Sequence, residues 1–149
     1  MKPVALIVWF SLVLAAFSAP AMADDRYVRF GEYEVHYNVF PSTFLTPEVA
    51  AANNLNRSRG IGIVNIAIMK RNDDGTLSTR PGQVEGQALN DIRQARFLAF
   101  RRIQEGDAVY FISEYQYRDG ELMTFQVTAR PSGHDRDQPI RFSQALFND

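Results

Sequence analysis

Alternating apolar and polar positions recur along the chain and predict a protein built mainly of β-strands. The clearest example is residues 32–40, where every second side chain is apolar, which is the period of a strand with one buried face. Its apolar positions are Tyr33, Val35, Tyr37 and Val39. Glu34, His36 and Asn38 then share the opposite face, which we expect to be solvated.

Several other segments carry strand signals. Residues 61–69 are apolar at both alternating sets of positions, which is typical of a strand buried on both faces. Asp119-Gly120 lies between two alternating runs and predicts a hairpin that pairs them. The remaining expectations are an extended lead-in at 26–30, strands at 83–90 (with Gly86 as a candidate bulge), 108–117, 122–130 and 140–147, and a helix or a strand at 94–103.

One short helix is predicted after the first full strand. Thr46 is a good N-cap, Pro47 suits the first helical turn, and Glu48 favours the positive end of the helix dipole. Asn53-Asn54 is expected to end it. About seven or eight strands with one short helix describe a mainly all-β fold, an antiparallel, immunoglobulin-like β-sandwich, with a small β-barrel as the alternative.

The first residues carry the pattern of a cleavable export signal. Lys2 supplies a positive start, residues 4–16 are almost uniformly apolar, and small residues ending at Ala23 form a cleavage site before Asp24. The apolar run is shorter than the roughly 20 residues that a membrane span needs. We therefore expect a signal peptide at residues 1–23 and a single domain at residues 24–149.

Composition narrows the partners and the chemistry. The chain has no cysteine, which excludes disulfides, thiolate metal sites and a lipid anchor attached at the signal. Its formal net charge is -1, without the strongly basic balance that a nucleic-acid partner favours. We expect a soluble domain held together by burial alone, with no nucleic-acid partner and no membrane span after signal cleavage.

The two histidines are the first candidates for chemistry. His36 shares its strand face with Glu34 and Asn38, a grouping that suits metal binding or proton transfer. Zinc needs three or four ligands, however, and the sequence indicates no others. His134 lies in a Ser-Gly-His-Asp segment typical of a loop, and no G-x-S-x-G motif accompanies it. We therefore predict no catalytic residue, no metal and no cofactor.

Arginines and tyrosines supply candidate binding groups. Arg57 and Arg59 flank Ser58 ahead of the apolar strand, where they are placed to receive an anion. The candidate binding surface consists of Glu34, His36, Asn38, Arg57, Arg59 and Asn65. Tyr115 and Tyr117 either pack in the core or line a ligand cavity.

Several segments, taken in order, resemble one bacterial family. They are residues 31–38, residues 42–50 (Ser-Thr-Phe-Leu-Thr-Pro-Glu-Val-Ala), Asn65-Ile66 and residues 105–110. The chain after its signal is similar, over essentially its whole length, to an exported proteobacterial family known as domain of unknown function number 4426. The resemblance implies a periplasmic location and is consistent with a β-sandwich, and it brings no activity, cofactor or catalytic residue.

The expected function is that of a periplasmic, non-catalytic module that binds an envelope protein or another envelope component. Two alternatives stay open. One is a metal-binding protein or hydrolytic enzyme that uses His36 and Glu34. The other is a small-ligand binder with an aromatic-lined cavity.

Overall fold

The computed structural model describes residues 26–148, and the predicted signal peptide at residues 1–23 lies outside this range. Antiparallel strands make up most of the structure. The strands are β1 (Tyr27–Phe30), β2 (Tyr33–Pro41), β3 (Ile61–Arg71), β4 (Leu77–Thr79), β5 (Gly82–Leu89), β6 (Ala95–Leu98), β7 (Arg101–Glu105), β8 (Ala108–Gln116), β9 (Leu122–Pro131) and β10 (Gln138–Ala145). The helices are the 3-10 helix η2 (Ser42–Phe44) and the α-helix α2 (Pro47–Ala52).

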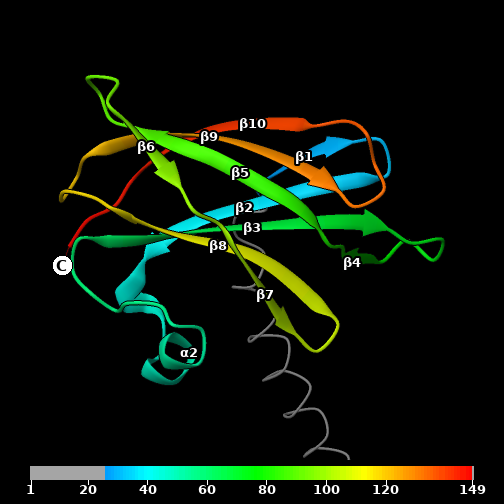
Figure 1. Cartoon of the computed structure of the whole chain (residues 1–149), viewed down its shortest axis with the longest axis horizontal. Coiled ribbons are helices and arrows are strands. Elements are labelled where there is room, and N and C mark those ends of the chain that lie inside the picture. Colours follow the sequence, from blue (N-terminus) through cyan, green and yellow to red (C-terminus); the bar gives the residue numbers. More distant parts are fainter. Residues whose placement is uncertain (1–25, 149) are drawn as a thin grey trace, which may run out of the picture.

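Two antiparallel sheets face each other across one core (Figure 1). The larger sheet has six strands in the order β1-β2-β3-β8-β7, with β4 also paired to β3. The smaller sheet has the order β10-β9-β5-β6. The predicted antiparallel β-sandwich with one short α-helix is confirmed. The described residues form ten strands instead of seven or eight, and the barrel alternative is wrong because the two sheets do not close into one.

Strands β1 to β4 all lie in the larger sheet, after which the hairpins β5–β6, β7–β8 and β9–β10 alternate between the two sheets. The predicted pairing of residues 108–117 with residues 122–130 is wrong, because these segments are β8 and β9, which lie in different sheets. Both strands present an apolar face to the same core, where the ring centroids of Tyr115 and Phe125 are 5.1 Å apart. Asp119-Gly120 therefore makes a turn between the layers, so that the two faces bury each other.

Aromatic packing fills the core between the sheets. Phe125 is fully buried, with its ring stacked on Phe142 at 5.0 Å between centroids and edge-on to Tyr115. Phe142 also stacks on Tyr37 at 4.3 Å. These rings join β2 and β8 of the larger sheet to β9 and β10 of the smaller one. Each such pair contributes about 0.5–1.5 kcal/mol beyond the burial of its area.

Strand β3 is buried on both faces, as its sequence predicts. One face contributes Ile66 and Ile68 to the main core. On the other face, Ile63 packs with Ala50 and Leu55 in a smaller cluster under helix α2. The helix therefore lies on the outside of the larger sheet, away from the smaller one (Figure 1).

Helix α2 begins and ends where the sequence predicts. The Thr46 hydroxyl accepts a hydrogen bond from the Val49 amide at 3.2 Å and caps the N-terminus of the helix. Pro47, which has no backbone N–H, occupies the first turn, where an N–H group would have no partner within the helix. The Asn53 amide donates to the last helix carbonyls. No helix among residues 26–148 is long and apolar enough to cross a membrane.

At residues 94–103 and at Gly86, the structure decides between or departs from the features that the sequence suggests. Residues 94–103 contain no helix, because they form β6 in the smaller sheet and the start of β7 in the larger sheet. Gly86 is not a bulge, since the pairing of β5 with β9 continues without interruption past it. A Cβ atom at Gly86 would lie 2.6 Å from the Gln126 carbonyl oxygen, so the glycine lets the two backbones approach closely.

Candidate functional site

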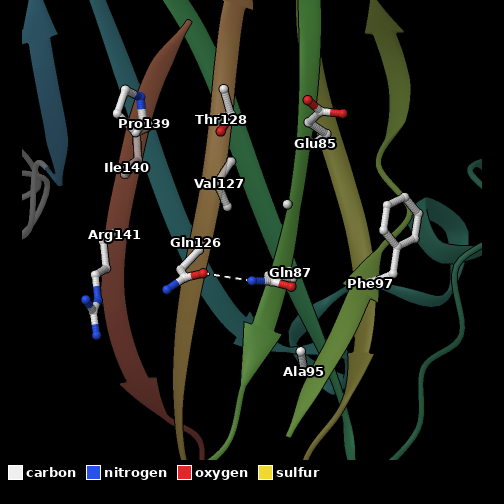
Figure 2. A pocket seen from close by; sticks show the side chains of 11 residues that line it. Glu85, Gln87, Ala95, Phe97, Gln126, Val127, Thr128, Pro139, Ile140 and Arg141 are labelled. Atoms are coloured by element: carbon white, nitrogen blue, oxygen red, sulfur yellow. Dashed lines mark hydrogen bonds between the residues drawn. The ribbon is translucent and has the colours of Figure 1, made fainter. Parts of the chain in front are cut away.

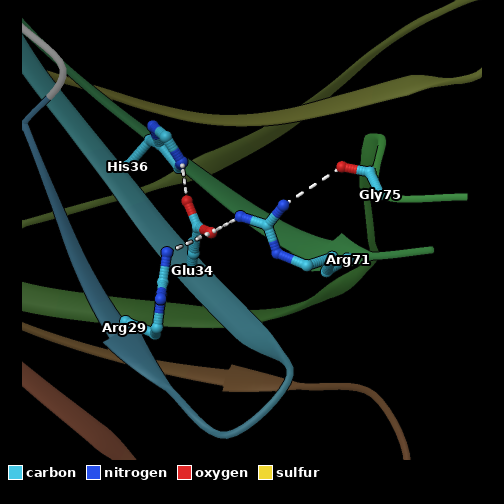
Figure 3. Close-up of polar contacts among 5 residues, drawn as sticks. All are labelled: Arg29, Glu34, His36, Arg71 and Gly75. Atoms are coloured by element: carbon cyan, nitrogen blue, oxygen red, sulfur yellow. Dashed lines mark hydrogen bonds and ion pairs between the residues drawn. The ribbon is translucent and has the colours of Figure 1, made fainter. Parts of the chain in front are cut away.

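A buried carboxylate organises part of the outer face of the larger sheet. Glu34 is 3% exposed although it alternates with the core residue Val35. Its Oε2 atom accepts a hydrogen bond from Arg71 Nη2 at 2.6 Å and lies 3.5 Å from Arg29 Nη2. Its Oε1 atom lies 3.1 Å from His36 Nε2 (Figure 3). The expectation of a solvated face is therefore wrong at Glu34, because its neighbours lie over it.

These neighbours lower the pKa of Glu34. Burial alone raises that pKa, since it disfavours the charged carboxylate. Hydrogen bonds from Arg71 and His36, with the positive charges of Arg71 and Arg29, outweigh burial and hold the pKa below its ordinary value. Arg71 also donates to the Gly75 carbonyl at 3.0 Å (Figure 3). The carboxylate thus ties β1, β2 and β3 to the turn that follows β3.

Four of the six residues of the predicted surface lie near one another on this face. His36 stacks on Tyr27 with ring centroids 5.0 Å apart. Asn38 of β2 is paired with Asn65 of β3. The Asn65 Oδ1 atom is buried and has no hydrogen-bond partner among the described residues. We call Glu34, His36, Asn38 and Asn65 the polar strip.

The other two predicted surface residues, Arg57 and Arg59, are held in the loop after α2. Arg57 donates hydrogen bonds to the Leu45 carbonyl at 2.6 Å and to the Thr43 carbonyl at 3.3 Å. Its guanidinium therefore satisfies carbonyls around the helix. Arg59 lines a separate hollow with residues of the β5–β6 and β8–β9 turns. The structure does not bring these two arginines into the polar strip.

The polar strip offers few metal-binding groups. The part of the chain from residue 26 to 148 contains no group of three His, Cys, Asp or Glu side chains that could hold a metal ion. His36 Nε2 faces the Glu34 carboxylate, and that carboxylate is already paired with Arg29 and Arg71. These groups are well placed to hold strands together and to form hydrogen bonds.

Tyr115 and Tyr117 are core residues, as the packing alternative predicts. Each is 6% exposed and belongs to the main core cluster. The Tyr117 hydroxyl donates to Asn148 Oδ1 at 2.5 Å, whereas the Tyr115 hydroxyl is buried without a hydrogen-bond partner in the described range. Burial, with a smaller effect of the neighbouring Tyr117, raises the pKa of Tyr115 above its ordinary value.

An open groove lies on the outer face of the smaller sheet (Figure 2). Its volume is about 840 Å³, within the range of about 300–1,000 Å³ that is typical of small-molecule sites. All four strands contribute side chains, including Glu85, Gln87, Ala95, Phe97, Gln126, Thr128, Pro139 and Arg141. The Phe97 ring is available to a ligand, because this residue is 80% exposed.

Strand register places four of these side chains in one row across the sheet. Arg141 of β10 is paired with Gln126 of β9. Gln87 of β5 is paired with Gln126 on one side and with Phe97 of β6 on the other. Gln87 Nε2 donates to Gln126 Oε1 at 2.8 Å and fixes the two central amides (Figure 2). With about 4.8 Å between neighbouring strands, the transverse row spans about 14 Å.

The sequence does not mark this groove. Phe97 lies in a segment whose pattern fits either a helix or a strand, and Gln87 lies in a strand with weak alternation. Gln87 and Gln126 meet only through the pairing of β5 with β9, which are far apart along the chain. A row of this kind follows from long-range register, which local patterns do not specify.

Together these features define a two-sheet antiparallel β-sandwich protein with an open groove on its smaller sheet. The chain belongs to the family described as domain of unknown function DUF4426, whose model matches residues 27–149. This confirms the resemblance found in the sequence. A solved structure of a DUF4426 family protein, PA0388 from Pseudomonas aeruginosa PAO1, is 31% identical, with a TM-score of 0.72 over 83% of this chain and 95% of that chain.

Two structures of FetP from uropathogenic Escherichia coli strain F11 share the fold. A copper-bound FetP variant has a TM-score of 0.59 and 10% identity, covering 80% of this chain and 93% of that chain. FetP as isolated after expression in the E. coli periplasm has a TM-score of 0.57 and 12% identity, covering 83% and 95%. At these identities the likeness shows the fold alone. No curated protein matches the chain.

Proposed function

We propose that this protein is an exported, periplasmic binding module, without catalytic activity of its own, whose ligand is an envelope protein or another component of the cell envelope. The groove on the smaller sheet carries the proposal. It is open, it is built on paired strands, and it combines an exposed aromatic ring with several polar side chains that converge. Sites with an apolar surface and a few fixed polar groups are suited to reversible binding.

The export part of the proposal is supported by the N-terminal sequence. Lys2, the apolar run at residues 4–16 and the small residues up to Ala23 are the three parts of a cleavable signal. Cell fractionation with N-terminal sequencing tests this part. The protein should be released by osmotic shock and begin near Asp24, whereas a cytoplasmic protein that keeps Met1 would contradict it.

Binding through the groove is tested by co-sedimentation with washed cell envelopes, using protein purified after expression of the full chain. Thr128→Arg adds a long charged side chain to the groove. Asn38→Arg makes a comparable change on the outer face of the larger sheet, where Asn38 is exposed. We expect Thr128→Arg to lose co-sedimentation and Asn38→Arg to keep it. Equal behaviour of the two variants would contradict the proposal.

Metal binding at His36 and Glu34 is a second candidate function. It is favoured by the distance of 3.1 Å between His36 Nε2 and Glu34 Oε1 and by the fold shared with FetP, one structure of which is copper-bound. Zinc or copper should then raise the melting temperature of the purified protein, and His36→Ala should abolish the rise. A melting temperature unchanged by both metals would end this candidate.

A further inference from the structure

We infer that the groove on the smaller sheet binds an uncharged oligosaccharide, which lies across the strands between Phe97 and Arg141. This inference rests on the proposed function, in which the groove is the binding face, and it names the chemical class of the ligand. The transverse row, the exposed ring and the balance of charge each favour this class over an acidic polymer or an extended peptide.

The centre of the transverse row presents a hydrogen-bond donor at one end of the amide pair and an acceptor at the other end (Figure 2). The bond between the two amides uses one N–H of Gln87 and one acceptor site on Gln126. The Gln126 NH2 group and the Gln87 Oε1 atom remain available to a ligand. A sugar hydroxyl both donates and accepts, as a serine or threonine hydroxyl does. Hydroxyls at two points along an oligosaccharide can therefore bond to the two ends of the amide pair.

Phe97 provides an apolar surface at one end of the row. The residue lies on the edge strand β6 and is 80% exposed, and Ala95 of the same strand also lines the groove. A sugar ring has faces made of C–H groups. When such a face packs on an aromatic ring, both partners remove apolar surface from water. The ligand thus gains an apolar contact next to the polar centre.

The groove is electrically balanced. Among its described lining residues, Glu85 and Arg141 carry charge, one negative and one positive, and they come from β5 and β10. A surface without an excess of one sign does not attract an ionic polymer. The binding of an uncharged glycan does not depend on this balance of charge. An acidic glycan would be attracted by Arg141 but repelled by Glu85.

Strand pairing disfavours an extended peptide in the same place. Peptides that bind β-proteins in extended form typically add to a sheet edge and bond to free backbone groups. Strand β9 is paired with β10 and β5, and β5 is paired with β9 and β6. The floor of the groove therefore offers side chains and no free backbone ladder. Apart from the bonds that the Gln87 and Gln126 amides could supply, the backbone amides of a bound peptide would give up water without gaining equivalent partners.

Titration calorimetry with soluble tetrasaccharides tests the inference on protein purified after expression of the full chain. Cellotetraose, chitotetraose and maltotetraose are the uncharged probes, tetragalacturonate is the acidic probe, and a neutral tetrapeptide is the peptide probe. We expect at least one uncharged tetrasaccharide to bind. The acidic probe and the peptide should bind about tenfold more weakly or worse, where tenfold corresponds to about 1.4 kcal/mol.

Groove variants test the location of this binding. Phe97→Ala should weaken it about tenfold, in line with the loss of one aromatic contact. Phe44→Ala is the matched control, since Phe44 is 75% exposed but lies in η2, and it should leave binding unchanged. Exchanging both Gln87 and Gln126 for alanine should abolish binding. Tetrasaccharide binding that survives these groove variants would overturn the location.

The outcomes separate the inference from the proposed function. If no uncharged tetrasaccharide binds while Thr128→Arg still abolishes envelope co-sedimentation, the ligand class is overturned and the proposed function stands. Stronger binding of the tetrapeptide or of tetragalacturonate than of all three uncharged probes overturns it in the same way. If Thr128→Arg has no effect on co-sedimentation, the proposed function itself fails.

Discussion

Replacing Tyr115 by phenylalanine should stabilise the protein or leave its stability unchanged, whereas the same replacement at Tyr117 should destabilise it. Tyr115 lies near the end of β8 and Tyr117 directly follows that strand, and each is 6% exposed. The Tyr117 hydroxyl donates to Asn148 Oδ1, while the Tyr115 hydroxyl is buried without a partner among residues 26–148. Because the chemical change is the same, the comparison measures what each hydroxyl contributes.

The expected free energies follow from the surroundings of each hydroxyl. A typical intramolecular hydrogen bond contributes about 0.5–1.5 kcal/mol, so Tyr117→Phe should lower the free energy of unfolding by about 1 kcal/mol. An unpaired buried polar group costs about 1–3 kcal/mol. Tyr115→Phe removes that cost but leaves a small void, which offsets part of the gain. Its net effect should therefore lie between zero and about 1 kcal/mol of added stability.

Urea unfolding followed by circular dichroism gives both values, provided that the slope m is unchanged. Alkaline pH provides a second measurement. Since the folded-state pKa of Tyr115 is raised above its ordinary value of 10.0, the unfolded chain loses this proton first, and the free energy of unfolding falls as the pH rises above that value. Tyr115→Phe should remove this fall. A larger destabilisation by Tyr115→Phe than by Tyr117→Phe would refute the reasoning, since the Tyr115 hydroxyl would then have a partner.

Three further predictions concern the Glu34 network and the smaller sheet. Arg71→Met should lower the free energy of unfolding by about 1.5–3 kcal/mol, because it removes a charge-assisted hydrogen bond to a buried carboxylate. Arg130→Met, the control, loses an exposed ion pair with Asp137 at 3.7 Å and an exposed hydrogen bond to Gln83, and it should cost at most about 1 kcal/mol. Equal losses of stability for the two variants in urea unfolding would contradict this. The stabilisation from Glu34 is complete above its ordinary pKa of 4.5 and should be lost as the pH falls through its lowered folded pKa, so thermal melts of Glu34→Gln should depend less on acid. Gly86→Ala should destabilise by about 1–3 kcal/mol in urea unfolding because the new methyl meets the Gln126 carbonyl, and a neutral result would exclude that close approach.

Local features of the fold could be predicted because they depend on residues close in sequence. The alternation at residues 32–40 and the cap at Thr46 each act within one element, and both are found in the structure. The pairing partner of a strand, by contrast, depends on residues far apart in sequence. An Asp-Gly pair such as Asp119-Gly120 favours a tight turn, but this signal does not tell whether the next strand joins the same sheet or the facing one. Here the facing apolar surfaces of β8 and β9 decide it.

The candidate sites were harder to predict for the same reason. The pattern around Glu34 indicates a polar strand face, yet Arg29 and Arg71 reach it from two other strands and bury it. Arg57, which follows α2 in sequence, donates to the Thr43 and Leu45 carbonyls ahead of that helix instead of reaching the polar strip. The transverse row exists only through the register of β10, β9, β5 and β6.

The most direct test of the groove as the binding face is an amide chemical-shift map of isotope-labelled protein, recorded while glycan released from cell envelopes is added. We predict shifts concentrated on the outer face of the smaller sheet, along the row from Phe97 to Arg141, with Tyr27 and His36 unaffected. Shifts concentrated on the polar strip of the larger sheet, with no shifts in the groove, would contradict the assignment of the groove as the binding face.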